Sequence, residues 1–224
     1  MVLAASYEAK AFGVRTAMSG GQARSLCPQA IVVPPRMSAY SQASKDVFDV
    51  FHDTSPLVEG ISIDEAFLEV GGLAKIVGNP LQIGANLRRD VAEQVGLPIT
   101  VGIARTKFLA KVASAFAKPD GLLRVPPEGE TEFLHPLPVE KLWGVGKITA
   151  QKLRNFDIVT VGDIARHDES SIVSILGVAP VAISTRSRTT EIRAPSAPIV
   201  AAVRWVLSMR WVADPIPAQN SMRR

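Results

Sequence analysis

The chain has 224 residues, of which 47% are hydrophobic and 21% charged, with a formal net charge of +4 and one cysteine. This length accommodates one large domain or two to three small ones. No apolar run reaches the ~18 residues that span a bilayer, and no signal-peptide pattern is present. A lone cysteine excludes an internal disulfide and a cysteine-rich metal site, so we expect a cytoplasmic protein. Without an apolar span we expect no membrane partner.

The positive charge is concentrated near one end of the sequence. Residues 178–224 contain seven arginines and two acids, whereas the other 177 residues carry 18 basic and 19 acidic groups. The net charge is therefore no argument that the main part of the chain binds a polyanion.

The first 52 residues contain short elements, as their apolar spacing and capping residues indicate. Helices are predicted at 7–12, from a cap at Ser19 to near Cys27, and at 37–52, and strands are predicted at 1–5 and 31–33.

Two short apolar segments then flank the adjacent acids Asp64 and Glu65. Residues 58–63 and 66–70 each alternate as half-buried strands do, which places the two acids at the junction of a hairpin. Paired carboxylates at the open end of a sheet suit a hard divalent cation such as Mg²⁺. A solvated acidic turn without further function is the alternative reading of the same residues.

The hairpin is followed by a helix at 80–95, a strand at 99–104 and a helix at 106–117. This order predicts an α+β fold in which a mainly antiparallel sheet carries helices on one face. A turn follows at 118–121, because its Lys-Pro-Asp-Gly sequence has the residues that turns prefer. Taken alone, Lys118 could be an ordinary solvated lysine.

Beyond Pro126-Pro127, the sequence predicts short helices and no strand as far as residue 177. Within this region, residues 142–147 read Leu-Trp-Gly-Val-Gly-Lys, and the two glycines permit a tight turn into the next helix. The free amides at such a helix start bind phosphate oxygens, and Lys147 and Lys152 would add positive charge. An ordinary helical hairpin is the alternative. Residues 178–224 show no sustained period and predict an irregular tail.

Five segments resemble, in order and rough spacing, the motifs of the Y-family (translesion) DNA polymerases, in particular the bacterial DinB type. They are residues 6–15, 62–67, 100–104, 117–121 and 142–147. The resemblance implies a palm with a mainly antiparallel sheet backed by helices, small fingers and an all-helical thumb with a helix-hairpin-helix. It ends near residue 177.

The resemblance also implies error-prone nucleotidyl transfer with two Mg²⁺ ions, in translesion synthesis and DNA repair. Asp64 and Glu65 match two of the three catalytic, metal-binding carboxylates of the family. Tyr7 and Lys118 match residues that bind the nucleotide triphosphate, and Lys10 stands where an arginine is common. Lysine keeps the charge there but loses the bidentate geometry. Arg105 and Lys107 could extend this positive surface.

The partners that the resemblance implies are primer–template DNA and deoxynucleoside triphosphates. The DNA backbone would be bound by residues of the helix-hairpin-helix turn, namely Gly144, Val145, Gly146 and Lys147. The family also uses a sliding clamp, but we identify no clamp-binding peptide in the tail. Two alternatives stay open. The chain could be a non-catalytic module that binds DNA or nucleotide, or a nucleotide cyclase, against which the helix-hairpin-helix argues.

By the same resemblance, we expect fingers at 1–36, a palm at 37–125, a partial thumb at 126–177 and an unrelated tail at 178–224. The family's third carboxylate lies on a first strand that would precede Met1. We therefore expect a fragment with impaired activity, an unpaired sheet edge and marginal stability. A one-base frameshift could explain the tail, because shifted codons for residues 183–193 could encode a sequence that resembles the family's continuation.

Overall fold

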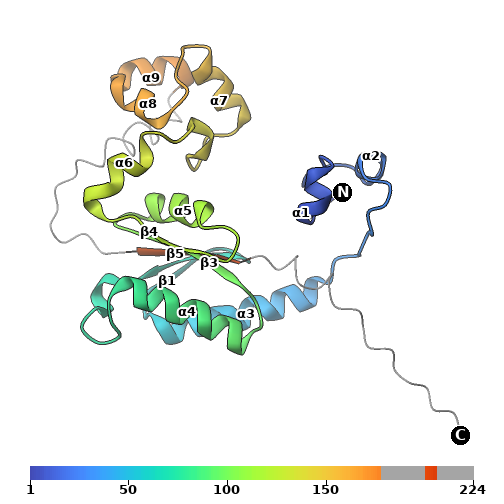
Figure 1. Ribbon diagram of the computed structural model, residues 1–224, viewed down its shortest axis with the longest axis vertical. Helices are drawn as coiled ribbons and strands as arrows, with labels where there is room; N and C mark the ends of the chain where they lie inside the picture. The colour runs from blue at the N-terminus through green and yellow to red at the C-terminus, as the bar shows by residue number, and fades with distance from the viewer. Residues whose placement is uncertain (178–199, 206–224) are drawn as a thin grey trace, which may run out of the picture. The chain divides into compact units, whose positions relative to one another are not determined.

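The computed structural model describes residues 1–177 and 200–205 of the chain (Figure 1). The chain divides into two compact units, which we name by the ranges Met1–Asp46 and Val47–Trp205; the described part of the second unit is residues 47–177 and 200–205. Among the described helices, none is both long and apolar enough to cross a membrane. The frameshift hypothesis concerns residues 183–193, which lie outside the described residues.

The first unit contains two short helices and the start of a third. α1 (Tyr7–Ala11) and α2 (Gly20–Leu26) confirm the two predicted helices, and Ser19 caps α2 as predicted. The structure adds a cap at Ser6 and a reciprocal capping box between Ser19 and Gln22. α3 (Met37–Thr54) confirms the long helix and continues into the second unit.

The strands predicted at 1–5 and 31–33 are wrong. Val2 exchanges backbone hydrogen bonds with Ala17 and Met18 in a loop, and Ile31 is 83% exposed. Short apolar segments become strands only when a neighbouring strand takes up their backbone hydrogen bonds.

The second unit is built on a five-stranded sheet in the order β1-β2-β5-β3-β4. Its strands are β1 (Val58–Ser62), β2 (Glu65–Glu69), β3 (Ile99–Ala104), β4 (Leu122–Arg124) and β5 (Val200–Trp205). β1 and β2 form the predicted hairpin, and β5 lies antiparallel to both β2 and β3. β4 is parallel to β3, so the sheet is mainly antiparallel as predicted.

β5 corrects two predictions, because it lies within the segment that we expected to be irregular and it pairs with β2. β2 therefore has a partner on each side, and the expected unpaired edge is wrong for this strand. The run Val-Ala-Ala-Val at the start of β5 does not alternate. Central strands covered on both faces read as continuous apolar runs, which is why alternation did not reveal this one.

Helices cover both faces of the sheet, which corrects the prediction of helices on one face (Figure 1). α5 (Lys107–Phe116) lies on one face, and α4 (Pro80–Gln94) lies on the other with the end of α3. A Cβ placed on Gly102 of β3 would lie 2.2 Å from the Ala110 carbonyl oxygen of α5. The neighbouring Ile103 instead contacts α4 at Gly84.

The region after β4 is helical, as predicted. It contains the 3₁₀ turns η2 (Pro127–Gly129) and η3 (Val139–Lys141) and the helices α6 (Glu130–Leu134), α7 (Lys147–Arg154), α8 (Val161–Arg166) and α9 (Glu169–Leu176). A further 3₁₀ turn, η1 (Gly71–Leu73), follows β2. Buried side chains of the helices that follow β4, among them Leu153 and Ile164, share one apolar core with Phe108 of α5 and Phe67 of β2. This core attaches the helical region to the α5 face of the sheet.

Candidate active site

Asp64 and Glu65 lie where the sequence predicted them, at the junction of β1 and β2. We call residues 62–65 the acidic turn. The Ser62 hydroxyl donates a 2.6 Å hydrogen bond to Oδ1 of Asp64 and accepts one from the Asp64 amide at 3.3 Å. The side chains of Asp64 and Glu65 are both partly exposed. The hairpin therefore presents two neighbouring carboxylates at one end of the sheet, with the first held by its own turn.

Two lysines of α5 lie against this hairpin, one helical turn apart. Nζ of Lys111 lies 3.0 Å from Oε2 of Glu65, with the two side chains 20% and 15% exposed. Lys107 pairs with Glu59 of β1. Neither pair was predicted, although i,i+4 lysines on the helix that packs against an acidic hairpin are a signal that the sequence contains.

The charges expected to extend a triphosphate-binding surface are already paired within the protein. Arg105 bonds to Glu130, and Lys107 bonds to Glu59. Each cation would have to leave its carboxylate to bind a phosphate, so the ion pairs give no support to this part of the prediction.

The 118–121 turn is held by an arginine of α4, Arg88, whose role was not predicted from the sequence. Nη2 of Arg88 donates to the carbonyl oxygen of Asp120 at 2.6 Å and to its Oδ1 at 2.9 Å. Asp120 has a φ of 48°, and a Cβ on Gly121 would lie 2.0 Å from the Ala117 carbonyl oxygen. The turn is thus tightly constrained, and it fixes the backbone of Lys118.

The strand register places this turn at the same end of the sheet as the acids. β4 begins directly after the turn, at Leu122, which pairs with Val101 of β3. The neighbouring Thr100 is opposite Arg204 of β5, which is opposite Glu65 of β2. β2 and β4 are three strand positions apart, or about 14 Å at the usual strand spacing. A ligand at this end could therefore contact both the acidic turn and the 118–121 turn.

Trp143 attaches the helix-hairpin-helix turn to the face of the sheet that α5 covers. The centre of the Trp143 ring lies 6.2 Å from the centre of the Phe67 ring and 4.4 Å from Nζ of Lys111. Gly144 adopts a φ of 95°, which favours glycine. Gly146 precedes α7 without a side-chain cap. The first amides of α7 and the exposed Lys147 can therefore bind a phosphate group.

Tyr7 and Lys10 lie together on α1, with Nζ of Lys10 4.8 Å from the centre of the Tyr7 ring. Both belong to the Met1–Asp46 unit, whereas Asp64, Glu65 and Lys118 belong to Val47–Trp205. The structure thus brings the predicted triphosphate residues of α1 together as a pair within their own unit.

The acid pair fits a hard divalent cation. Mg²⁺ is commonly held by one or two carboxylates, with water and substrate phosphates completing its shell. Asp64 and Glu65 supply two carboxylates on consecutive residues. Within residues 1–177 and 200–205, no group of three or more His, Cys, Asp and Glu side chains could hold a metal. The described part of the chain therefore offers two of the three carboxylates that the resemblance implies.

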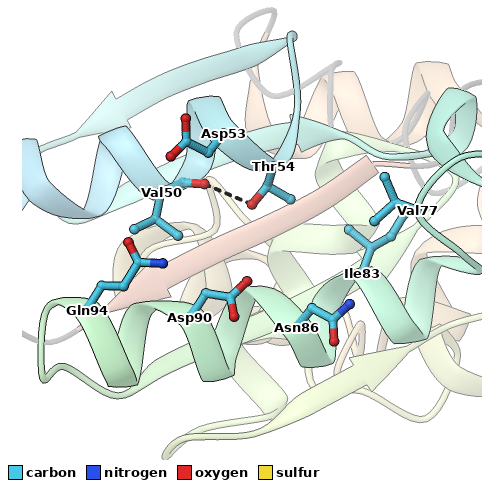
Figure 2. A pocket seen from close by; sticks show the side chains of 8 residues that line it. All are labelled: Val50, Asp53, Thr54, Val77, Ile83, Asn86, Asp90 and Gln94. Carbon is cyan, nitrogen blue, oxygen red and sulfur yellow. Dashed lines mark hydrogen bonds between the residues drawn. The ribbon is translucent and has the colours of Figure 1, made fainter.

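A separate pocket of about 180 Å³ is lined by residues of α3 and α4 and by Val77 (Figure 2). α4 and the end of α3 lie on the other side of the sheet from α5 (Figure 1). Figure 2 shows Asp53 of α3 and Asp90 of α4 in the pocket lining, with the Thr54 hydroxyl bonded to the Val50 carbonyl oxygen. Its lining residues are distinct from those of the acidic turn, so it plays no part in the candidate active site.

The sequence of this chain is similar to two protein-family models and to several known proteins. The model of the impB/mucB/samB family matches residues 1–115, and the model of the IMS family HHH motif matches residues 127–158. DNA polymerase IV 2 of Mesorhizobium japonicum is 49% identical over 179 residues, which cover 80% of this chain and 43% of that protein. DNA polymerase IV of Pseudomonas fluorescens is 42% identical over 177 residues, covering 79% and 50%. The chain spans about half the length of the curated relatives it matches.

Solved structures show the same similarity. DinB from Sulfolobus solfataricus superposes with a TM-score of 0.77 at 27% identity, over 84% of this chain and 56% of that one. A DinB family error-prone DNA polymerase from the same organism gives a TM-score of 0.78 at 27% identity, over 88% and 60%. An insertion ternary complex of Dbh DNA polymerase gives 0.75 at 28% identity, over 84% and 55%.

Proposed function

This chain belongs to the impB/mucB/samB family, the DinB-type Y-family DNA polymerases, and from that premise we propose that it acts in error-prone, template-directed DNA synthesis. The observation that carries the proposal is the shared sheet end, where Asp64 and Glu65 lie with the 118–121 turn. The helix-hairpin-helix turn is joined to the same face through Trp143. The substrates we propose are primer–template DNA and deoxynucleoside triphosphates.

In this proposal, Asp64 and Glu65 hold Mg²⁺, with Ser62 fixing the Asp64 carboxylate through its hydrogen bond. When bound, Mg²⁺ stabilises the attacking 3′-oxygen and the leaving pyrophosphate of an in-line displacement. Lys118 offsets the negative charge that builds up on the triphosphate, and the turn anchored by Arg88 holds its backbone in place.

The remaining roles concern binding. Tyr7 and Lys10 of α1 bind the triphosphate as part of the fingers, which we place at residues 1–36, and we place the palm at residues 37–125. The turn of Gly144, Val145 and Gly146 presents the free amides at the start of α7, which bind a DNA phosphate together with Lys147, in a thumb segment at 126–177. Backbone amides and lysine read charge and shape rather than base sequence, which suits a polymerase that must act on any template.

A second candidate function is binding of DNA or nucleotide without turnover. One observation favours it. Among the described residues, the candidate metal site has two carboxylates and not three, and one of them, Glu65, is paired with Lys111. Binding and primer extension measured on one primer–template with Mg²⁺ and four deoxynucleotides separate the two functions. Incorporation supports the polymerase, whereas binding without incorporation supports the binding module.

A further inference from the structure

Lys111 of α5 touches two parts of the candidate site at once. Its ammonium lies 3.0 Å from Oε2 of Glu65, and it lies 4.4 Å from the centre of the Trp143 ring. The Lys111 side chain is 20% exposed and the Glu65 side chain 15%. Trp143 directly precedes Gly144, which turns the chain into the helix-hairpin-helix. One side chain thus joins the acidic turn to the segment that we assign to DNA.

The position of this ammonium matters because a divalent cation needs the same carboxylate. A cation that binds Asp64 and Glu65 must share Glu65 with Lys111 or displace it. Either event is opposed by the positive charge of the lysine. At an effective dielectric near that of water, a unit charge about 6 Å from a divalent cation lowers its affinity about tenfold.

The aromatic ring holds the lysine in this place. Trp143 is 40% exposed, and its ring also packs against Phe67, which is 3% exposed. A cation over the face of a tryptophan is stabilised by about two- to fivefold at a partly exposed site. The Glu65 carboxylate and the Trp143 ring therefore together hold the Lys111 ammonium in place.

We propose that Lys111 is a positioning residue, which holds the Glu65 carboxylate and sets the affinity of the Asp64–Glu65 pair for a divalent cation, with Trp143 as its support. This inference rests on the proposed function, because it takes the acid pair to be the metal site. It assigns Lys111 no contact with DNA or nucleotide.

α5 supplies a matched control one helical turn away. Lys107 carries the same charge and also pairs with a glutamate of the hairpin, but that glutamate is Glu59 of β1. The Lys107 and Glu59 side chains are 49% and 60% exposed, so their pair lies in a better-screened environment. Replacement of Lys107 removes a positive charge from the same face without releasing Glu65.

The experiment is a Mn²⁺ titration of the full chain, followed by the electron paramagnetic resonance signal of free Mn²⁺. We expect wild-type binding that is lost in Asp64→Ala. We expect Lys111→Met, which keeps an apolar stem and loses the charge, to bind Mn²⁺ about tenfold more tightly. Trp143→Leu should bind about two- to fivefold more tightly. Lys111→Arg and Lys107→Met should stay within about twofold of wild type.

Circular dichroism melts establish that each variant is folded, and Lys111→Gln, which also loses the charge, replaces Lys111→Met with the same expected result if that variant does not fold. Unchanged or weaker Mn²⁺ binding by folded Lys111→Met would overturn the inference and leave the metal site standing. Tighter binding by Lys111→Arg would overturn it as well, because that variant keeps the charge. Failure of wild type and Lys111→Met alike to bind Mn²⁺ would instead overturn the metal site and, with it, the proposed function.

Discussion

The Glu130 carboxylate accepts two hydrogen bonds from the Arg105 guanidinium, at 2.7 Å from Nη2 and 3.2 Å from Nε. Glu130 is 3% exposed and the Arg105 side chain 16%, and the hydrogen bond to Glu130 raises the pKa of Arg105. Arg105 directly follows β3 and Glu130 begins α6. This buried pair therefore fastens the helical region to the sheet that carries the acidic turn.

We predict that Glu130→Ala lowers the free energy of unfolding of the Val47–Trp205 unit by about 3 kcal/mol, because it leaves a largely buried guanidinium without its carboxylate. Urea denaturation followed by circular dichroism measures the change. The matched control is Asp90→Ala, which breaks the exposed pair with Arg89 and should cost less than about 1 kcal/mol. Equal losses in the two variants would contradict the role of the buried pair.

A second prediction concerns the close approach of α5 to β3. A Cβ on Gly102 would lie 2.2 Å from both the Ala110 carbonyl oxygen and the Ser114 amide nitrogen. Because backbone atoms cannot give way as a side chain does, Gly102→Ala should destabilise the protein by about 3 kcal/mol or more. Gly20→Ala, at a position with open space, is the control and should change stability by less than about 1 kcal/mol. Thermal melts compare the two, and a Gly102→Ala variant as stable as its control would show that α5 does not pack this closely.

The helical region should lose stability in acid. The hydrogen bond from the Thr160 amide lowers the pKa of Asp163, and hydrogen bonds from Ser170 and Ser171 lower that of Asp168. A pKa that is lower in the folded state gives stability that is complete above the unfolded value, near 3.9, and is lost as the pH falls through the folded value. Urea midpoints measured from about pH 5 to about pH 2 should fall, and Asp163→Asn with Asp168→Asn should flatten that fall. Parallel curves for variant and wild type would refute this origin of acid sensitivity.

The helix-hairpin-helix turn should contribute charge contact rather than base recognition. We predict that Lys147→Ala weakens binding to duplexes of unrelated sequence by a similar factor and reduces the slope of log affinity against log salt by about one. Lys75→Ala removes the same charge from an exposed loop after η1 and should leave the slope unchanged. Fluorescence anisotropy at several salt concentrations measures both. A loss confined to one DNA sequence would argue for base contacts instead.

The acidic turn could be predicted from the sequence because its signals are local. Two alternating segments flank Asp64 and Glu65, and both the strands and the turn lie within 58–70. The caps at Ser19 and Asn79 were predictable for the same reason, since each capping box closes within four residues.

What the sequence did not reveal depends on residues far apart in the chain. β5 pairs with strands about 100 or more residues earlier, so no local pattern announces its place in the sheet. Lys111 meets Glu65 across 46 residues, and Arg88 meets Asp120 across 32. Helices cover both faces because the alternate residues of β3 contact α4 and α5. The apolar run of β3 is consistent with this cover but does not specify it.

The central claim is that Asp64 and Glu65 form the catalytic centre, and primer extension by wild type and Asp64→Ala tests it most directly. We predict Mg²⁺-dependent incorporation on an undamaged template by wild type, a loss of about a hundredfold or more in Asp64→Ala, and full activity in the control Asp90→Ala. Equal incorporation by Asp64→Ala would contradict the claim, and so would a wild-type chain that binds primer–template and adds no nucleotide.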